Sequence, residues 1–402
     1  MKKDIIILLF GQNMPMETAE KYGYKVINIH TKESFNVSNL SNHSINDNTI
    51  ITADIKEIEN TVEKIHKSHS IIGIFSFTDR YNGTYLASKL NKEFNIFSFA
   101  PPNSIEIINN KILTREYLST INMPNISYIV TNNKKDVYTF FNKTEKDIII
   151  KPFDGEGSRL VSKISNLNEI DSYFQNIPSS YKNYKFIVEE NIKGIEVSVE
   201  VLIINEKVHI VGVTDKVLHI DNLTNPYVEK AHIFPSRISH NKIERINKNV
   251  VNFFKNLNVK NGIAHLEFII TDQNIPFLIE AHLRPGGGGI TRLINNSSNL
   301  NIYKAFFDGI FDSSSNFNIE YKNESCILFL TPKPGILKSV IVPTFSYEFI
   351  NLFNVNIKEK SVIKPIKESK DTIYGEIVVT SPDKNSYEIA KSIEDRIQLD
   401  YE

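Results

Sequence analysis

Apolar-rich runs alternate with segments of helical periodicity along the N-terminal quarter of the chain. Residues 5–10 are apolar throughout, as expected for a strand that is buried on both faces. In residues 54–66, apolar side chains recur at every third or fourth position, which predicts an amphipathic helix. The predicted strands lie at residues 5–10, 25–29, 71–77 and around Ile96, and the predicted helices at residues 16–22, 54–66 and 81–90. This alternation predicts an α/β unit built on a parallel sheet.

Two residues follow predicted parallel strands where ligands often bind. Ligands of such sheets collect beyond the carboxyl ends of the strands, which makes Gly11 and Asp79 weak site candidates. For Gly11 a plain turn is the favoured alternative, because glycine is common wherever the chain reverses.

A helical segment at residues 103–124 leads to a strand and a loop rich in small residues. Lys111 lies inside this segment, and by itself it is either a solvated lysine or a ligand for an anion. The strand at residues 147–150 ends at Lys151, and backbone N–H groups, a hydroxyl and a lysine together suit a phosphate cradle. The order of residues is not that of a Walker A motif, and an ordinary hairpin loop is the alternative. The other candidates in this loop are Gly155, Gly157 and Ser158.

Strands at residues 186–190 and 196–204 are predicted on either side of a short loop. Two acids end the first strand, and Glu196 begins the second. The backbone of such a hinge can read a purine edge, and Glu196 suits ribose hydroxyls. An ordinary acidic hairpin is the alternative.

The stretch at residues 262–292 is a predicted hairpin with chemistry on both arms. Glu267 and Glu280 interrupt apolar runs, and a buried carboxylate is costly unless it is paired or binds a metal. Two carboxylates on neighbouring strands can share one Mg²⁺ ion, which prefers oxygen ligands together with phosphate. A hairpin whose acids are satisfied internally is the alternative. The strands span residues 263–271 and 276–281, and the turn is residues 272–274.

Arg284 comes four residues after Glu280 and just before a run of four glycines. Backbone without side chains can approach a ligand closely, which makes Gly287 and Gly288 candidate contacts. A flexible turn is the alternative for the same glycines.

Composition narrows the function class. The chain has 402 residues, which suggests two or three domains, and a net charge of −1 gives no reason to expect nucleic acid or an anionic membrane as a partner. The single cysteine, Cys326, lies in an apolar run, so we expect neither disulfides nor a thiolate metal site, and a cytoplasmic location fits. Apolar runs long enough to span a bilayer are not found.

Taken together, these motifs resemble the ATP-grasp superfamily, specifically its carboxylate–amine ligases. Residues 188–200 are similar to the family's adenine hinge, and residues 265–268 and 279–284 to its metal-binding strands. The tail, from Gly335 to Ala390, resembles the C-terminal region of biotin-carboxylase-like members. The resemblance covers nearly the whole chain.

The resemblance implies an α/β fold with an antiparallel-sheet ATP-grasp part. It divides the chain into a Rossmann-like N-terminal domain at residues 1–105, a linker helix and lid at 106–190, and a C-terminal ATP-grasp domain with its tail at 191–402. The lid carries the phosphate loop and is expected to close over the intermediate.

For the nucleotide, the resemblance implies five matching positions. Lys111 and Lys151 match the two lysines that contact nucleotide phosphates. Glu189, Ile192 and Glu196 match the positions that hold adenine and ribose. ATP is therefore the expected cofactor.

For the reacting end, Glu267 and Glu280 match the Mg²⁺ ligands of the family, with Mn²⁺ as an alternative ion. Arg284 matches the arginine that holds the acyl phosphate, beside Gly287 and Gly288.

One position departs from the family pattern, and one segment points to the substrate. His282 stands where these ligases commonly have asparagine as a further Mg²⁺ ligand, and imidazole is a poorer Mg²⁺ ligand than oxygen. His282 is therefore a candidate for contact with substrate or phosphate. Residues 213–216 and 227–236 resemble the substrate side of dipeptide-forming L-amino-acid ligases. Within that likeness, Glu229 is expected to pair with the ammonium group and His232 with the carboxylate.

The function implied is an ATP-dependent ligase that joins a carboxylate, such as an L-amino acid, to an amine through an acyl phosphate. Its partners would be these small molecules, with a homodimer as one compatible assembly. Two alternatives remain open: a bicarbonate-using carboxylase of the biotin carboxylase or purine type, and a non-catalytic nucleotide-binding protein.

Overall fold

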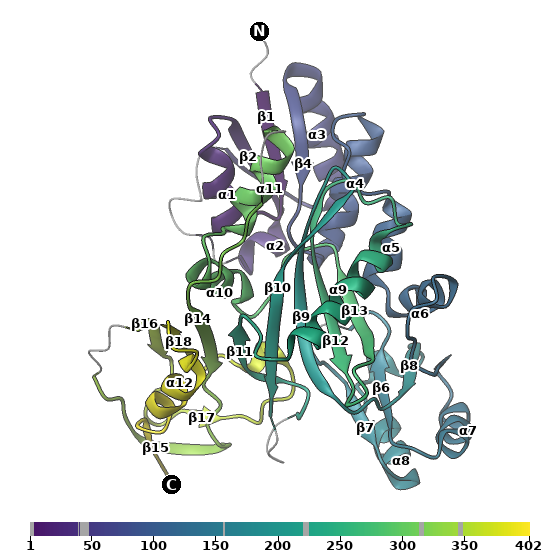
Figure 1. Ribbon diagram of the computed structural model, residues 1–402, viewed down its shortest axis with the longest axis vertical. Coiled ribbons are helices and arrows are strands. Elements are labelled where there is room, and N and C mark those ends of the chain that lie inside the picture. Colours follow the sequence, from purple (N-terminus) through teal and green to yellow (C-terminus); the bar gives the residue numbers. More distant parts are fainter. Residues whose placement is uncertain are drawn as a thin grey trace.

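The computed structural model describes residues 4–38, 40, 48–155, 157–219, 225–312, 317–344 and 349–402. These residues build four sheets, which Figure 1 shows as an N-terminal part at the top, a small sheet at the lower right, a long central sheet and a C-terminal tail at the lower left. The chain is a mixed α/β protein, as the sequence predicts.

The N-terminal sheet is parallel and has the strand order β3-β2-β1-β4. Strand β1 is buried on both faces, which explains its unbroken apolar sequence. The parallel sheet predicted from the sequence is confirmed. Its strands are β1 (Asp4–Leu9), β2 (Lys25–Thr31), β3 (Thr49–Thr52) and β4 (Ser70–Phe75), and its helices are α1 (Asn13–Glu20), α2 (Lys32–Asn36), α3 (Ile55–Ser68) and α4 (Gly83–Glu93), with a short 3₁₀ helix, η1 (Arg80–Asn82).

Two sequence expectations in this region are wrong. The strand expected around Ile96 does not form, since residues 95–101, all of them described, contain neither helix nor strand. The carbonyl of Phe99 instead accepts hydrogen bonds from the backbone N–H groups of Lys260 and Asn261. The backbone at Phe99 is therefore bonded to a loop and not to a neighbouring strand. The helical segment expected at residues 103–124 is two helices, α5 (Pro102–Asn109) and α6 (Lys111–Thr120). Asn110 separates them because its side chain caps the N-terminus of α6.

A small antiparallel sheet with two helices follows α6. Its strand order is β5-β8-β6-β7, and its apolar face packs on both helices. This is the part predicted to act as a lid. Its elements are β5 (Tyr128–Thr131), α7 (Lys134–Thr144), β6 (Ile148–Pro152), β7 (Ser162–Ile164), α8 (Leu167–Asn176), η2 (Ser179–Tyr181) and β8 (Phe186–Glu190).

The central sheet is antiparallel and has the order β13-β12-β9-β10-β11-β14-β18-β16. The predicted hairpin forms its β12–β13 edge, and the strand expected at residues 196–204 is β9. The largest hydrophobic core of the described residues lies between this sheet and its helices. The elements are β9 (Ile195–Ile204), β10 (Lys207–Leu218), β11 (Glu229–Phe234), α9 (His240–Phe254), β12 (Gly262–Ile270), β13 (Pro276–His282), α10 (Ile290–Ser297), α11 (Ile302–Phe311), β14 (Glu324–Phe329), β16 (Ile350–Val355) and β18 (Gly375–Ser381).

Aromatic packing fixes the N-terminal sheet against the central one. Phe75, at the end of β4, makes edge contacts with Phe306 and Phe307 of α11, with ring centroids 5.6 and 5.7 Å apart. Phe77 contacts Tyr303 in the same way. These contacts bring the loop after β4, which contains Asp79, beside the predicted hairpin.

The tail adds a three-stranded sheet of order β17-β15-β19 and a helix that packs on β14 and β18. The domain boundaries given above stay a prediction. No helix within the described ranges is both long enough and apolar enough to cross a membrane. The tail elements are β15 (Gly335–Ile341), β17 (Val362–Ile363), η3 (Ser369–Asp371), α12 (Ser386–Glu394) and β19 (Gln398–Tyr401).

Candidate functional site

A pocket of about 610 Å³ lies between the small sheet, the central sheet and the tail. Its size is that of a typical small-molecule site. Every residue that the sequence singled out for the nucleotide, the metal and the substrate lines it, whereas Gly11 does not. The backbone N–H of Gly11 donates to the side chain of Asn28, in keeping with the turn interpretation. The predicted site residues in the lining are Lys111, Lys151, Gly155, Gly157, Ser158, Glu189, Ile192, Glu196, Glu229, His232, Glu267, Glu280, His282, Arg284, Gly287 and Gly288.

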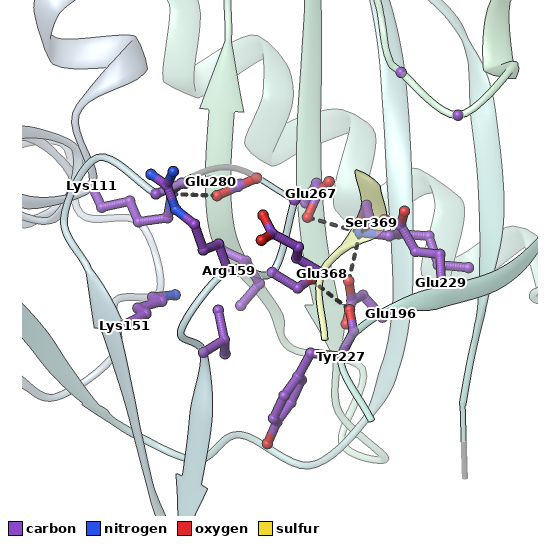
Figure 2. A pocket seen from close by; sticks show the side chains of 18 of the residues that line it. Lys111, Lys151, Arg159, Glu196, Tyr227, Glu229, Glu267, Glu280, Glu368 and Ser369 are labelled. Carbon is purple, nitrogen blue, oxygen red and sulfur yellow. Dashed lines mark hydrogen bonds and ion pairs between the residues drawn. The ribbon is translucent and has the colours of Figure 1, made fainter. Parts of the chain in front are cut away.

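Two carboxylates form the centre of the pocket. Glu267 and Glu280 are direct partners in the β12–β13 ladder, so both side chains project from the same face of the sheet (Figure 2). Lys111 Nζ lies 2.6 Å from Glu280, and Lys216 Nζ lies 2.8 Å from Glu267. Burial raises the pKa of Glu280, but Lys111 and His282 outweigh it and hold that pKa well below its usual range. The pair is therefore ionised and held by cationic side chains.

Sequence reasoning missed Lys216, which is the most highly connected of these cations. Its ammonium group, on β10, lies 2.7 Å from Glu196 and 2.8 Å from both Glu229 and Glu267. Its side chain is only 4% exposed. The signal that would have found it is the one that found Glu267, namely a charge in a strand that is otherwise apolar and therefore needs partners.

A second missed residue supports the phosphate loop. Arg115 on α6 is completely buried, and its Nε lies 2.6 Å from Glu189, whose other oxygen is 2.7 Å from Lys151 Nζ. Arg115 also donates to the carbonyl of Ile279 on β13. The carboxylate of Glu189 thus holds Lys151 in place, and the hinge lines the pocket as far as Ile192.

The phosphate loop is folded against the rest of the protein. Lys111 Nζ donates to the carbonyl of Gly155 at 2.8 Å, and the hydroxyl of Ser158 donates to the carbonyl of Tyr227 at 2.6 Å. The backbone N–H of Ser369, in the tail, donates to the carbonyl of Gly157 at 2.9 Å. Ser369 lines the same pocket (Figure 2). The loop therefore joins the predicted lid to the central sheet and the tail.

We expect nucleotide to protect this loop from protease. Arg159 is exposed and offers trypsin a cleavage site within the loop. Phosphate oxygens that bind the loop's N–H groups should hold it closed, so cutting at Arg159 should slow when ATP and Mg²⁺ are added. The measurement is the rate of appearance of the two fragments on a gel.

Cleavage at Lys182, which is exposed and outside the pocket lining, provides the control and should keep its rate. Asn225→Ala removes a hydrogen bond to the carbonyl of Ser158 and should speed cutting at Arg159. An unchanged rate at Arg159 with nucleotide would show that the loop is not a phosphate cradle.

The predicted substrate side of the pocket contains His232 and the glycine turn. His232 Nδ1 donates to the carbonyl of Gly288 at 3.0 Å, and Nε2 lies 3.6 Å from Glu229. Nε2 is buried and makes no hydrogen bond within the part of the chain that the structure describes. Gly288 has φ of +56°, and a Cβ there would lie 2.5 Å from the His232 ring, so only glycine fits. A buried ring nitrogen without a hydrogen-bond partner in a pocket is suited to a ligand.

The donor set fits a hard divalent cation. A lysine ammonium group lies against each of the two carboxylates, Glu280 and Glu267. Both carboxylates therefore already bind a cationic group. Across the described residues, no cluster of three or more His, Cys, Asp or Glu forms a complete metal cage. Mg²⁺ is usually held by one or two carboxylates together with substrate phosphates, which matches this pair.

Part of the chain is similar in sequence to known proteins. Residues 144–292 match the family model of the ATP-grasp domain. The ATP-grasp enzyme fsqD of Aspergillus fumigatus is 24% identical over 237 residues, which are 55% of this chain and 39% of that protein. A D-alanine–D-alanine ligase of Fervidobacterium nodosum is 26% identical over 214 residues, which are 51% of this chain and 65% of that protein. The chain thus spans less than two thirds of the length of either relative.

Solved structures share the fold along the full chain. The L-amino acid ligase from Bacillus licheniformis has a TM-score of 0.76 at 16% identity, covering 100% of this chain and 99% of that one. The carboxyaminoimidazole ribonucleotide synthase from Aspergillus clavatus, solved with ATP, has a TM-score of 0.72 at 15% identity, covering 98% and 99%. At these identities the likeness establishes the fold and leaves the substrate open.

Proposed function

We propose that this chain, whose residues 144–292 match the ATP-grasp domain, joins a carboxylate to an amine at the expense of ATP, through an acyl phosphate. The observation that carries the proposal is the placement of Glu267 opposite Glu280, in one pocket with Lys111, Lys151 and Arg284. Such a pocket combines two acids for a cation with cations for phosphate, which phosphoryl transfer requires.

The chemistry follows from the leaving group. A carboxylate does not react with an amine at neutral pH, because its leaving group would be oxide. Attack of a carboxylate oxygen on the γ-phosphorus of ATP breaks the bond to ADP and gives an acyl phosphate. The amine nitrogen then attacks the acyl carbon. Phosphate leaves and takes with it the carboxylate oxygen that attacked the γ-phosphorus, and the nitrogen loses a proton to give the amide.

The chain's own residues position and stabilise these steps. Lys111 and Lys151 would contact the nucleotide phosphates, and Arg284 the transferred group. Glu267 and Glu280 would hold Mg²⁺, which when bound offsets negative charge on the phosphates. The lid loop would exclude water, which would otherwise hydrolyse the acyl phosphate.

We further propose that the acyl donor or acceptor is an L-amino acid. Support comes from Glu229 and the unpartnered Nε2 of His232, which offer an acid and an imidazole to one ligand. Glu229 would receive the ammonium group in place of part of its contact with Lys216, and His232 in its protonated form would donate from Nε2 to the carboxylate. Glu196, beside the hinge, would bind the ribose.

The test is ADP release with amino acids offered singly and in pairs, with bicarbonate as a separate arm. ADP formation that requires two amino acids, with a dipeptide detected by mass spectrometry, would support the proposal. ADP formation that requires bicarbonate alone would favour the alternative of a bicarbonate-using carboxylase. A biotin carboxylase from Campylobacter jejuni is among the structural neighbours. No ADP formation in any arm would overturn the amino acid assignment.

A further inference from the structure

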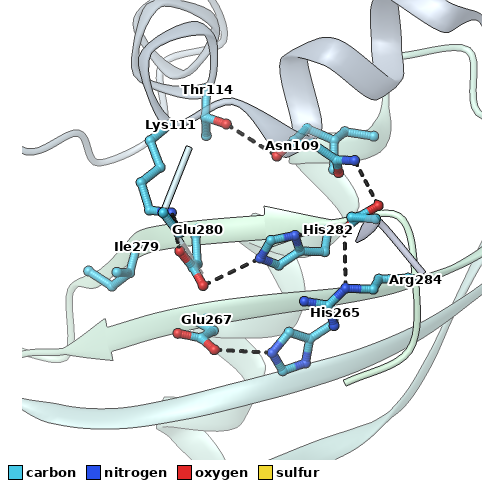
Figure 3. A network of polar contacts seen from close by, with 12 residues as sticks. Asn109, Lys111, Thr114, His265, Glu267, Ile279, Glu280, His282 and Arg284 are labelled. Atoms are coloured by element: carbon cyan, nitrogen blue, oxygen red, sulfur yellow. Dashed lines mark hydrogen bonds and ion pairs between the residues drawn. The ribbon is translucent and has the colours of Figure 1, made fainter. Parts of the chain in front are cut away.

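Two matching chains of side chains stand behind the pair of acids in the pocket. Each consists of a carboxylate, an imidazole and one of the two pocket glutamates. Figure 3 shows the contacts of His265 with Glu267 and of His282 with Glu280. His265 and His282 are direct partners in the β12–β13 ladder, and their rings lie 6.3 Å apart and nearly parallel. The two chains are therefore side by side, one on each strand of the hairpin.

The first chain begins at Glu200, which is fully buried on β9. Its carboxylate accepts from His265 Nδ1 and from the backbone N–H of Gly286 at 3.0 Å. His265 Nε2 lies 3.2 Å from Glu267 Oε1. Glu200 thus fixes the ring of His265 with its other nitrogen against Glu267.

The second chain begins outside the central sheet, at Asp79 in the loop after β4. Its Oδ2 accepts from His282 Nδ1 at 2.9 Å and forms an ion pair with Arg284, whose Nε lies 3.1 Å away. Its Oδ1 accepts from Thr84 Oγ1 at 2.7 Å and from Asn109 Nδ2 at 2.8 Å. Three hydrogen-bond donors and one ion pair hold both oxygens of the carboxylate, so its orientation is fixed.

The link to the acid pair is completed by His282, whose Nε2 lies 3.3 Å from Glu280 Oε1. The ring is buried, and both of its nitrogens have a carboxylate partner. Asp79 therefore reaches two functional groups at once, Glu280 through an imidazole and Arg284 directly. Neither Asp79 nor Glu200 lines the pocket.

We propose that Asp79 is a positioning residue for phosphoryl transfer, which acts through His282 on Glu280 and by direct contact on Arg284. Glu200 does the same for Glu267 through His265. The inference rests on the function proposed above, and it gives the N-terminal part of the chain a defined task at the metal end of the pocket. It also gives His282 a role other than metal ligand, since its two nitrogens are committed to Asp79 and Glu280.

The physical reason is the need for fixed geometry. A glutamate side chain has several rotatable bonds, and a cation site works only when its oxygens stay in place. Partners that hydrogen-bond a metal-binding side chain typically change metal affinity or activity by about 10–100-fold when they are lost. Asp79→Asn keeps the shape but turns an amide N–H toward one of its present donors, so the His282 ring loses its fixed orientation.

The experiment uses Mn²⁺ as a spectroscopic probe in the presence of ADP, with the free ion measured by electron paramagnetic resonance. Wild type is compared with Asp79→Asn, His282→Ala and the double variant. We expect Asp79→Asn to weaken Mn²⁺ binding about 10–100-fold and to lower kcat more than it raises KM for ATP. Because Asp79 acts on Glu280 through His282, the Mn²⁺ affinity of the double variant should be about that of the single variant with the lower Mn²⁺ affinity.

Two further variants separate positioning from general damage. Glu324→Gln alters another buried carboxylate, held by Arg237 at 2.6 Å and by Ser386 in the tail, and should lower Tm without changing Mn²⁺ binding. Thr84→Val removes one donor to Asp79 and should weaken Mn²⁺ binding by less than Asp79→Asn does. Thr84→Val also keeps the inference testable if Asp79→Asn does not fold.

The outcomes distinguish the inference from the function on which it rests. Wild-type Mn²⁺ affinity in both Asp79→Asn and Thr84→Val, with only a lower Tm, would make Asp79 a purely structural residue. Losses that add in the double variant would show that Asp79 does not act through His282. Either result overturns the inference and leaves the proposed function intact. Wild-type protein that fails to bind Mn²⁺ with ADP would instead remove the metal site, and the proposed function with it.

Discussion

Glu280→Gln is expected to abolish most ATP turnover while the protein stays folded. The amide has nearly the shape of the carboxylate but carries no charge, so the predicted cation site loses half of its anionic ligands. A bound metal contributes several kcal/mol to stabilising charge in the transition state. Loss of that contribution corresponds to a fall in kcat on the order of 10³-fold.

The fold should tolerate this change because two electrostatic effects oppose each other. The substitution removes the 2.6 Å ion pair with Lys111, but Lys111 keeps its hydrogen bond to Gly155. It also removes the repulsion by which Glu280 raises the pKa of Glu267. We therefore expect Tm to change little in Glu280→Gln.

The measurements are steady-state ADP release at saturating Mg²⁺ and thermal unfolding of the same preparation. Glu376→Gln is the matched control, because Glu376 also forms an ion pair with a cationic side chain, Arg292 at 2.8 Å, and lies outside the pocket lining. It should keep full activity. Near-normal turnover in Glu280→Gln would remove the central claim about the acid pair.

Arg284→Lys is expected to lower kcat by about 10²–10³ with little change in KM for ATP. A guanidinium can hold two oxygens of the transferred group at once, whereas an ammonium acts as a single point. Because charge on those oxygens grows toward the transition state, the loss should appear in kcat more than in KM.

The contacts of Arg284 also allow a structural role, which the same variant tests. Its Nε lies 3.1 Å from Asp79, and Nη1 donates to the carbonyl of Pro285, so it also fixes the start of the glycine turn. If that were its whole task, Arg284→Lys would lower Tm and leave kcat of the folded fraction unchanged.

Arg237→Lys provides the comparison, since Arg237 pairs with Glu324 and Glu388 and lies outside the pocket lining. That variant should lower Tm alone. A destabilised but fully active Arg284→Lys would sink the assignment of Arg284 to the reaction.

The sequence by itself determined those helices and strands whose pattern of apolar and polar residues is local. The hairpin of β12 and β13 could be predicted because each arm is a short apolar run beside a turn, and such patterns act within a few residues. Glu267 and Glu280 could be selected for the same reason, since a charge inside an apolar run needs a partner wherever the chain folds. The parallel N-terminal sheet followed from alternating strands and helices.

Local pattern failed where a tertiary or capping contact competed with it. Residues around Ile96 read as a strand, but the backbone at Phe99 is hydrogen-bonded to residues 260 and 261 instead of to a sheet. The helix expected at residues 103–124 breaks because the side chain of Asn110 satisfies the first N–H groups of a new helix.

Which charges meet was decided only by the tertiary structure. Asp79 and His282 are 203 positions apart, and Arg115 and Glu189 are 74 apart, so no local pattern links the members of either pair. Lys216 lies among three glutamates because β10, β9, β11 and β12 are brought together in one sheet. The sequence shows that a buried charge needs a partner, and only the packing of distant elements determines which partner it has, because the energy of such a pair depends on distance and burial and not on separation along the chain.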